Sequence, residues 1–195
     1  MKRMLLNTTL GAVAIMALLS CQSKKQETPS NDESVEIAKD ANDSTFDDRG
    51  EEKDADFVVN VVTSNLAEIK IAQLAKNKSG NADIQAMATK LEEQHMKLLN
   101  ELKAYADKRG IAIPLQETDK DAREMEKLSQ ETPEKFDKQW CESMEDRHEK
   151  SISKFESRLN KTDDQELKQW ITATLPGLKE HLSMLEHHEK MRDGQ

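Results

Sequence analysis

Apolar residues recur at three- and four-residue steps over four long stretches of the chain, the spacing that places side chains on one face of a helix. The clearest stretch runs from Asn81, which can cap the first turn, to Gly110, which can end the helix in a left-handed conformation. About 28 residues rising 1.5 Å each make a rod of roughly 42 Å. Its stripe consists of Ile84, Ala88, Leu91, His95, Leu98, Leu102 and Ala106. A helix of this length needs partners of similar length to bury that stripe.

Three further stretches supply the partners. The same periodicity predicts helices over about 54–77, 133–160 and 162–185, and a short surface helix over 119–128. No alternating strand pattern competes with these helices, and no fixed 30- to 50-residue repeat is present. The fold class predicted is therefore all-α: an up-down-up-down four-helix bundle with a short extra helix between helices 2 and 3.

The amino terminus resembles a bacterial lipoprotein signal. Lys2 and Arg3 precede an apolar run from Leu10 to Leu19, which is followed by Ser20 and Cys21. The apolar run is about half of the roughly 20 residues that a membrane span requires. We expect residues 1–20 to be a signal peptide, Cys21 to carry the lipid anchor, and the mature protein to lie in the bacterial cell envelope, on the periplasmic side or at the outer membrane.

Residues 21–53 are polar and charged, with few apolar positions. Such a segment buries too little surface to offset its ordering entropy, so we expect a disordered acidic tether between the lipid and a four-helix-bundle domain over 54–190. A short helix around Ser34 to Asp40 would not change that role.

Charge and cysteine content narrow the function classes. Removal of the signal takes away two basic residues and no acidic one, leaving 27 basic against 38 acidic residues, an excess that disfavours nucleic acid as a partner. With Cys21 lipidated, Cys141 would be a lone thiol, so stability must come from the packed core. No Gly-rich phosphate loop, haem attachment or partnered nucleophile is evident, and an enzyme is the least supported class.

Each of the four stripes contains one residue able to bind a metal: Glu68, His95, His148 and His181. At 1.5 Å per residue, His95 and His148 each lie about 21 to 23 Å from the ends of their helices, and the other two lie within about one turn of that level. Three imidazoles and one carboxylate suit one divalent transition metal, zinc-like or iron. A hydrogen-bonded network that binds no metal is the alternative, because a histidine on an apolar face is more often a satisfied core residue.

Two Glu-x-x-His pairs, Glu92 with His95 and Glu145 with His148, have the spacing of ferritin-like carboxylate sites. Leu178 stands where a third such pair would need a glutamate, which argues against a full di-iron centre. Glu92 and Glu145 are then either exposed helix-face carboxylates or additional groups that orient or bind at the metal. His187 and His188 are expected to be a surface pair.

A set of positions resembles a bacterial family known as domain of unknown function 4142. The set comprises Leu66-Ala67-Glu68-Ile69, Leu74-Ala75, His95 with Leu102 and Ala106, Ile113-Pro114, Phe136-Asp137, Met144 with His148, and Leu175-Pro176-x-Leu178-x-x-His181-Leu182. The resemblance covers about Phe57 to Leu185 and implies a ferritin-like bundle of a secreted or outer-membrane protein. It also implies that the four candidate ligands are positions the family keeps polar.

The chain departs from the family pattern at two positions. Gln94 stands where an aspartate usually precedes the histidine, and Trp140 stands where a tyrosine is usual. The first departure removes a carboxylate that could have oriented His95. Two hypotheses follow: a lipid-anchored envelope protein with a buried His/Glu metal site, or a structural or interaction module with a buried His/Glu network.

Overall fold

The structure is a computed structural model that describes residues 30–193. These residues form six helices and no strand, so the prediction of an all-helical fold is confirmed. The helices are α1 (Asn31–Asp43), α2 (Arg49–Lys78), α3 (Ala82–Arg109), α4 (Asp119–Gln130), α5 (Pro133–Leu159) and α6 (Gln165–Asp193). The expected signal peptide and Cys21 lie outside the described residues.

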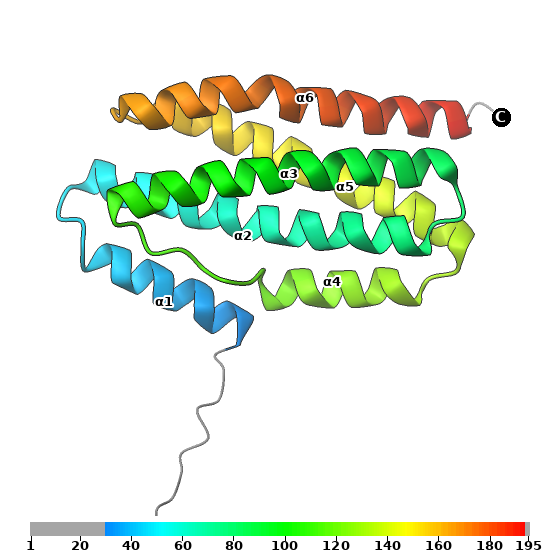
Figure 1. The fold of residues 1–195 in the computed structure, drawn as a ribbon, viewed down its shortest axis with the longest axis horizontal. Helices are drawn as coiled ribbons and strands as arrows, with labels where there is room; N and C mark the ends of the chain where they lie inside the picture. Colours follow the sequence, from blue (N-terminus) through cyan, green and yellow to red (C-terminus); the bar gives the residue numbers. More distant parts are fainter. Residues whose placement is uncertain (1–29, 194–195) are drawn as a thin grey trace, which may run out of the picture.

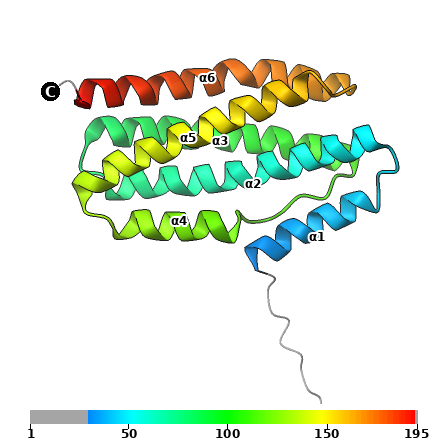
Figure 2. The same ribbon diagram turned by 180° about the vertical axis from the view of Figure 1, so that it is seen from behind.

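The four long helices α2, α3, α5 and α6 pack side by side as a helical bundle (Figure 1). The prediction that each long helix reverses the one before it is wrong for α5. Helix α4 carries the chain back along the bundle, so that α3 and α5 run in the same direction (Figures 1 and 2). Two ion pairs agree with this order, since Arg109 at the end of α3 contacts Asp164 before α6, and Arg158 at the end of α5 contacts Asp54 in α2.

Local capping explains where the helices begin and end. The Asn81 side chain accepts a hydrogen bond from the Asp83 N–H at 2.8 Å, and Gly110 adopts a left-handed φ of 69°, as the sequence predicts. Helix α2 begins at Arg49, five residues before the expected start at Asp54. Asp48 caps it by accepting hydrogen bonds from the Gly50 and Glu51 N–H groups. Thr132 makes no side-chain cap bond, although Pro133 occupies the first turn of α5 as expected.

The bundle interior contains two apolar clusters separated by a polar layer. One cluster is built around residues 55–69, 99–111 and 167–178, and the other around 71–91 and 128–144. Glu68, His95, His148 and His181 fall between the two clusters and are all at most 3 % exposed. A layer of four buried polar groups between two apolar clusters needs internal partners, because water cannot reach all of them.

The prediction of a disordered tether over 21–53 is wrong for residues 31–43 and 49–53, which are helical. Residues 31–43 form α1, and α2 begins at Arg49, so the packed unit starts well before residue 54. Val35 and Ala38 are buried against Val59, and the Asn42 side chain both donates to the Ala112 carbonyl (2.9 Å) and accepts from the Ala112 N–H (2.7 Å). A short apolar face and one two-way amide contact thus hold a segment that composition alone marks as disordered.

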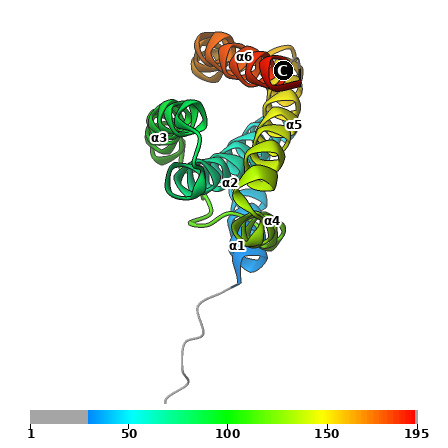
Figure 3. The same ribbon diagram turned by 90° about the vertical axis from the view of Figure 1, so that its right-hand side faces the viewer.

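Helices α1 and α4 both lie beside α2, on the side of the bundle away from α6 (Figure 3). Helix α4 matches the short helix expected over 119–128, with Thr118 accepting from the Asp121 N–H as its cap. Within residues 30–193, no helix has the length and apolar character needed to span a membrane.

Candidate metal centre

One side chain from each long helix meets at the middle of the bundle. Glu68 comes from α2, His95 from α3, His148 from α5 and His181 from α6. The three histidines place ring nitrogens within 4.8 Å of one another. The prediction that these residues lie at the same height along the bundle is therefore correct, although the predicted direction of α5 is wrong. His95 and His148 lie near the middle of their helices, so reversing α5 leaves them level.

The contacts converge on His148 Nε2. This atom lies 3.3 Å from His95 Nε2 and 3.1 Å from His181 Nδ1. Glu68 Oε2 lies 3.2 Å from His95 Nε2 and 3.9 Å from His148 Nε2. Four potential donor atoms thus face a common point.

The contact made by the other ring nitrogen of His148, Nδ1, determines which tautomer the neutral ring adopts. His148 Nδ1 lies 2.7 Å from the backbone carbonyl of Met144, one turn earlier in α5. A carbonyl oxygen can only accept, so the proton of the neutral ring resides on Nδ1. His148 Nε2 therefore presents a lone pair to the centre.

His95 is oriented in the same way by an amide. Asn65 Nδ2 donates to the His95 backbone carbonyl at 2.8 Å, which leaves Asn65 Oδ1 facing His95 Nδ1 at 2.6 Å. The amide oxygen accepts, so His95 Nδ1 carries the proton and Nε2 presents a lone pair. Asn65 lies one turn before Glu68 on α2, so one helix both orients a histidine and contributes the carboxylate.

His181 is oriented from the neighbouring helix α3. Its Nε2 donates to Gln94 Oε1, leaving the Nδ1 lone pair directed at His148. Gln94, one of the two departures from the family pattern, therefore accepts a hydrogen bond from His181. Its position next to His95 in the sequence had suggested an effect on His95 instead. Metal-bound histidines commonly donate their remote N–H to such an acceptor, which sets both tautomer and ring orientation.

Burial disfavours the charged forms of His95, His181 and Glu68. Burial lowers the pKa of His95 to about 3, with a further decrease from His148, and it lowers the pKa of His181 to about 3, with further decreases from His95 and His148. Burial also raises the pKa of Glu68, against an opposing effect of His148. Desolvation disfavours the charged form of both residue types.

Glu68 Oε2 is buried and receives no hydrogen bond from any residue between 30 and 193. The nearest nitrogen, His95 Nε2, has no proton to donate because the His95 proton resides on Nδ1. An unpaired buried oxygen costs roughly 1 to 3 kcal/mol. As an ionised carboxylate Glu68 therefore needs a cation at Oε2, and as a neutral acid it could donate only to His95 Nε2, 3.2 Å away.

The glutamates of the two Glu-x-x-His pairs do not join the centre. Glu92 binds Lys76 and Gln73 on the α2–α3 surface, and these contacts lower its pKa. Glu145 faces Glu189, and burial followed by the neighbouring carboxylates raises its pKa to about 7. The idea that either glutamate orients a ring or adds a ligand is therefore wrong, and the centre has one carboxylate.

The remaining sequence candidates are also separate from the centre. Cys141 is buried, and burial raises the pKa of its thiol to about 12, as fits a packing residue. His187 is exposed and His188 half-buried near the end of α6.

Sequence reasoning missed the role of Asn65. Its signal was its position three residues before Glu68, which places both polar side chains on one helix face. The Met144 carbonyl could not have been identified, because every residue of a helix has a backbone carbonyl.

A sequence model of a protein family, described as domain of unknown function (DUF4142), matches residues 38–187. The match begins inside α1, ends inside α6 and includes all four residues of the centre. Neither a curated protein nor a solved structure matches the chain.

Proposed function

The chain belongs to the family of domain of unknown function 4142, and from that premise and the geometry of the buried layer we propose that it binds one divalent transition metal. The ligands are His95, His148, His181 and Glu68. Imidazole and carboxylate donors suit zinc, iron and related divalent ions.

The observation that carries the proposal is a shortage of protons between acceptors. His148 Nε2 faces the lone pairs of His95 and His181 at 3.3 and 3.1 Å, and the proton of each ring is already donated outward. A proton on Glu68 could bridge only its contact with His95. A proton on His95 or His181 would relieve the shortage, but burial lowers the pKa of both rings to about 3. A proton on His148 Nε2 could be donated to one of its three neighbours and would leave the other contacts unpaired. A cation at the common point satisfies all four acceptors at once.

The spacing of the acceptors supports a compact first coordination shell. Donors about 2.0 to 2.1 Å from a tetrahedral ion lie about 3.3 to 3.4 Å from one another. A tetrahedron has six edges. Three separations that involve His95 or His148, at 3.3, 3.1 and 3.2 Å, are close to that edge length, the Glu68–His148 separation is 3.9 Å, and the His95 and His181 nitrogens lie within 4.8 Å of each other. Glu68 accounts for the long edge, so we expect its carboxylate to shift slightly when the ion binds.

The bundle is, in this proposal, a ferritin-like one. Ferritin-like bundles have one long crossover connection, and α4 with its flanking segments occupies that place in the chain order. The centre differs from a di-iron site in having a single carboxylate, and this favours one ion over two.

The test of metal binding uses tag-free protein, elemental analysis and zinc or cobalt titration. Wild type is expected to bind one equivalent, and His95→Ala is expected to abolish binding because it removes a central donor. His188→Ala is the matched control and should bind as wild type does. Wild type that binds less than half an equivalent, or unchanged binding in His95→Ala, would favour a metal-free hydrogen-bonded network.

We also propose that the protein is held at the bacterial cell envelope by a lipid on Cys21. The support is the basic and apolar leader that ends in Leu18-Leu19-Ser20-Cys21. Cys21→Ser should move the protein from the membrane fraction to the soluble fraction of cells. Equal membrane retention of both forms contradicts the anchor.

A further inference from the structure

A polar cleft reaches the centre from the surface between α2, the start of α4 and α5. It has a volume of about 280 Å³, and Glu68 is among its lining residues. Hydroxyl groups of Thr63, Ser64 and Ser151 also line it. The single carboxylate of the centre therefore borders a cleft that admits polar molecules.

A second, much smaller cavity of about 20 Å³ lies next to His95. It is lined by both Glu68 and His95, and it shares Ser64, Ser151 and Lys154 with the cleft. One water occupies about 10 to 15 Å³ by this measure. The cavity therefore has room for one small ligand atom beside the donor groups.

Two of the four cations lining the cleft are already neutralised. Arg147 pairs with Asp121 and Glu124, and Lys150 pairs with Asp146. Lys120 and Lys154 are exposed and form no ion pair with any residue in the described range. Lys154 lines both the cleft and the small cavity, and its positive charge acts on Glu68, where it opposes the rise in pKa caused by burial.

The opposite face of the centre lacks such a charge. A groove of about 270 Å³ between α3 and α6 reaches His95 and His181, and the lysine that lines it, Lys97, pairs with Glu101 at 3.9 Å. Both faces offer space, but among residues 30–193 only the cleft is lined by lysines that form no direct ion pair, Lys120 and Lys154.

We propose that the cleft is an entry and binding site for a small inorganic anion, whose leading atom occupies the small cavity and binds the metal beside Glu68. The inference rests on the proposed metal site and names the class of its additional ligand. A divalent ion with one carboxylate and three neutral imidazoles has a net charge of +1, and a buried net charge favours one further anion. Lys154 and Lys120 attract that anion to the cleft.

The experiment titrates azide into the tag-free full chain loaded with cobalt(II) and follows the visible absorption of the ion. Wild type should show a saturable change in the cobalt spectrum. Lys154→Gln should bind azide about three- to fivefold more weakly at low salt, the size expected for one partly exposed charge. Lys97→Gln, on the opposite groove, is the matched control and should bind azide as wild type does.

A steric variant tests the small cavity independently of charge. Ser64→Val adds bulk where the cavity and cleft meet, so it should bind cobalt as wild type does and lose the azide response. A cobalt-loaded wild type that ignores azide overturns the inference, as does a larger loss in Lys97→Gln than in Lys154→Gln. Failure of the wild type to bind cobalt in the initial titration overturns the metal site itself, a result distinct from loss of the azide response alone.

Discussion

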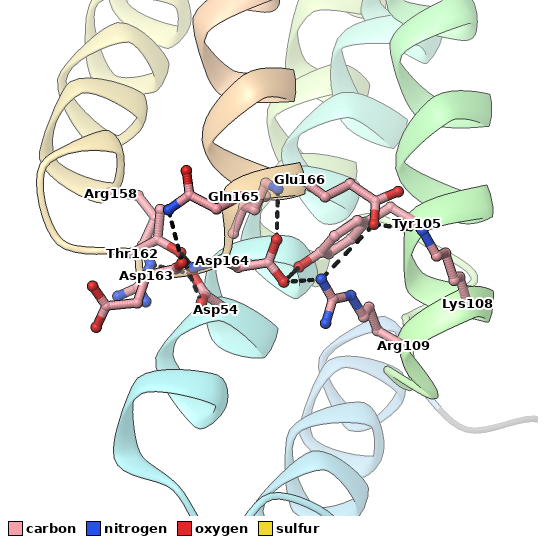
Figure 4. A network of polar contacts seen from close by, with 11 residues as sticks. Asp54, Tyr105, Lys108, Arg109, Arg158, Thr162, Asp163, Asp164, Gln165 and Glu166 are labelled. Atoms are coloured by element: carbon pink, nitrogen blue, oxygen red, sulfur yellow. Dashed lines mark hydrogen bonds and ion pairs between the residues drawn. The ribbon is translucent and has the colours of Figure 1, made fainter.

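Two buried polar regions of the same bundle differ in how their groups are paired. At the end where α2 begins, Asp54 accepts hydrogen bonds from Arg158 at 2.5 Å and from Thr162 at 2.9 Å (Figure 4). Arg158 also donates to the Gly50 carbonyl at 3.0 Å. At the middle of the bundle, by contrast, lone pairs of three imidazoles face one another and a carboxylate.

The same end region contains a second paired group around Asp164. Tyr105 donates to this carboxylate at 3.2 Å, and Arg109 forms an ion pair with it (Figure 4). Burial and then the Asp164 charge raise the pKa of Tyr105, so its hydroxyl stays protonated and able to donate. A cavity of about 380 Å³ lies here, yet the buried carboxylate that lines it, Asp54, already has its partners.

The difference shows why burial of polar residues does not by itself indicate a ligand site. In the end region, donors meet acceptors and the network is complete within the chain. In the central layer, acceptors meet acceptors, and the proposed metal ion would pair with all of them at once. Breaking each region should therefore have different consequences, and the following predictions use that difference.

The largest expected effect is on stability in the end region. Asp54→Ala leaves a guanidinium that is 8 % exposed without its carboxylate and should lower the free energy of unfolding by about 3 to 5 kcal/mol. Urea denaturation measures the change. Lys108→Ala breaks the exposed Lys108–Glu166 pair and is the control, with an expected loss below about 1 kcal/mol. Loss of zinc stoichiometry in a folded Asp54→Ala protein would contradict the separation of the two regions.

The next effect is a pH dependence of the metal-free protein. The unfolded state protonates its histidines below pH 6.5, whereas folded His95 and His181 resist protonation until about pH 3. The unfolded state thus binds more protons in this window, and stability falls as pH falls. Glu68 opposes the trend, because its raised pKa makes the folded state bind a proton more readily above pH 4.5.

The two histidines outweigh Glu68, so lowering the pH from 7 to 5 should reduce the free energy of unfolding by about 2 to 4 kcal/mol in the presence of chelator. His95→Gln should show a shallower dependence, since one of the two resisting rings is gone. Urea titrations at several pH values provide the measurement. If the free energy of unfolding changes equally with pH in wild type and His95→Gln, His95 is charged in the folded state.

The smallest effect concerns the orientation of one ring. Gln94→Ala removes the acceptor for His181 Nε2 and should weaken zinc binding by about 10- to 100-fold, the usual effect of losing such a partner. Gln94→Asp restores an acceptor and should recover most of the affinity. Competition with a chromophoric chelator measures both, and identical affinities for all three proteins would show that Gln94 does not orient the ring.

Features that follow from a local pattern with one geometric outcome could be predicted from the sequence. The four-residue steps identified all four long helices, and Asn81 and Gly110 marked both ends of α3 because their preferences act within one turn. Glu68, His95, His148 and His181 were grouped correctly because mid-helix positions share a level whichever way a neighbouring helix runs.

Features that depend on partners distant in the chain could not be predicted from local patterns. Residues 31–43 looked too polar to pack, but Ala112, about 70 residues away, binds Asn42 on both its N–H and its carbonyl. The direction of α5 was also missed, since a connection containing a short helix can either turn back at once or cross the length of the bundle.

The helices, their apolar faces and the four polar residues on those faces could be read from spacing within each helix. Which nitrogen of each ring points inward could not, because it depends on how the helices pack. That choice depends on an acceptor supplied by the Met144 carbonyl, by Asn65 or by Gln94, and two of these three acceptors belong to a neighbouring helix. The packing of whole helices therefore directs the lone pairs to one point, which no single helix can specify alone.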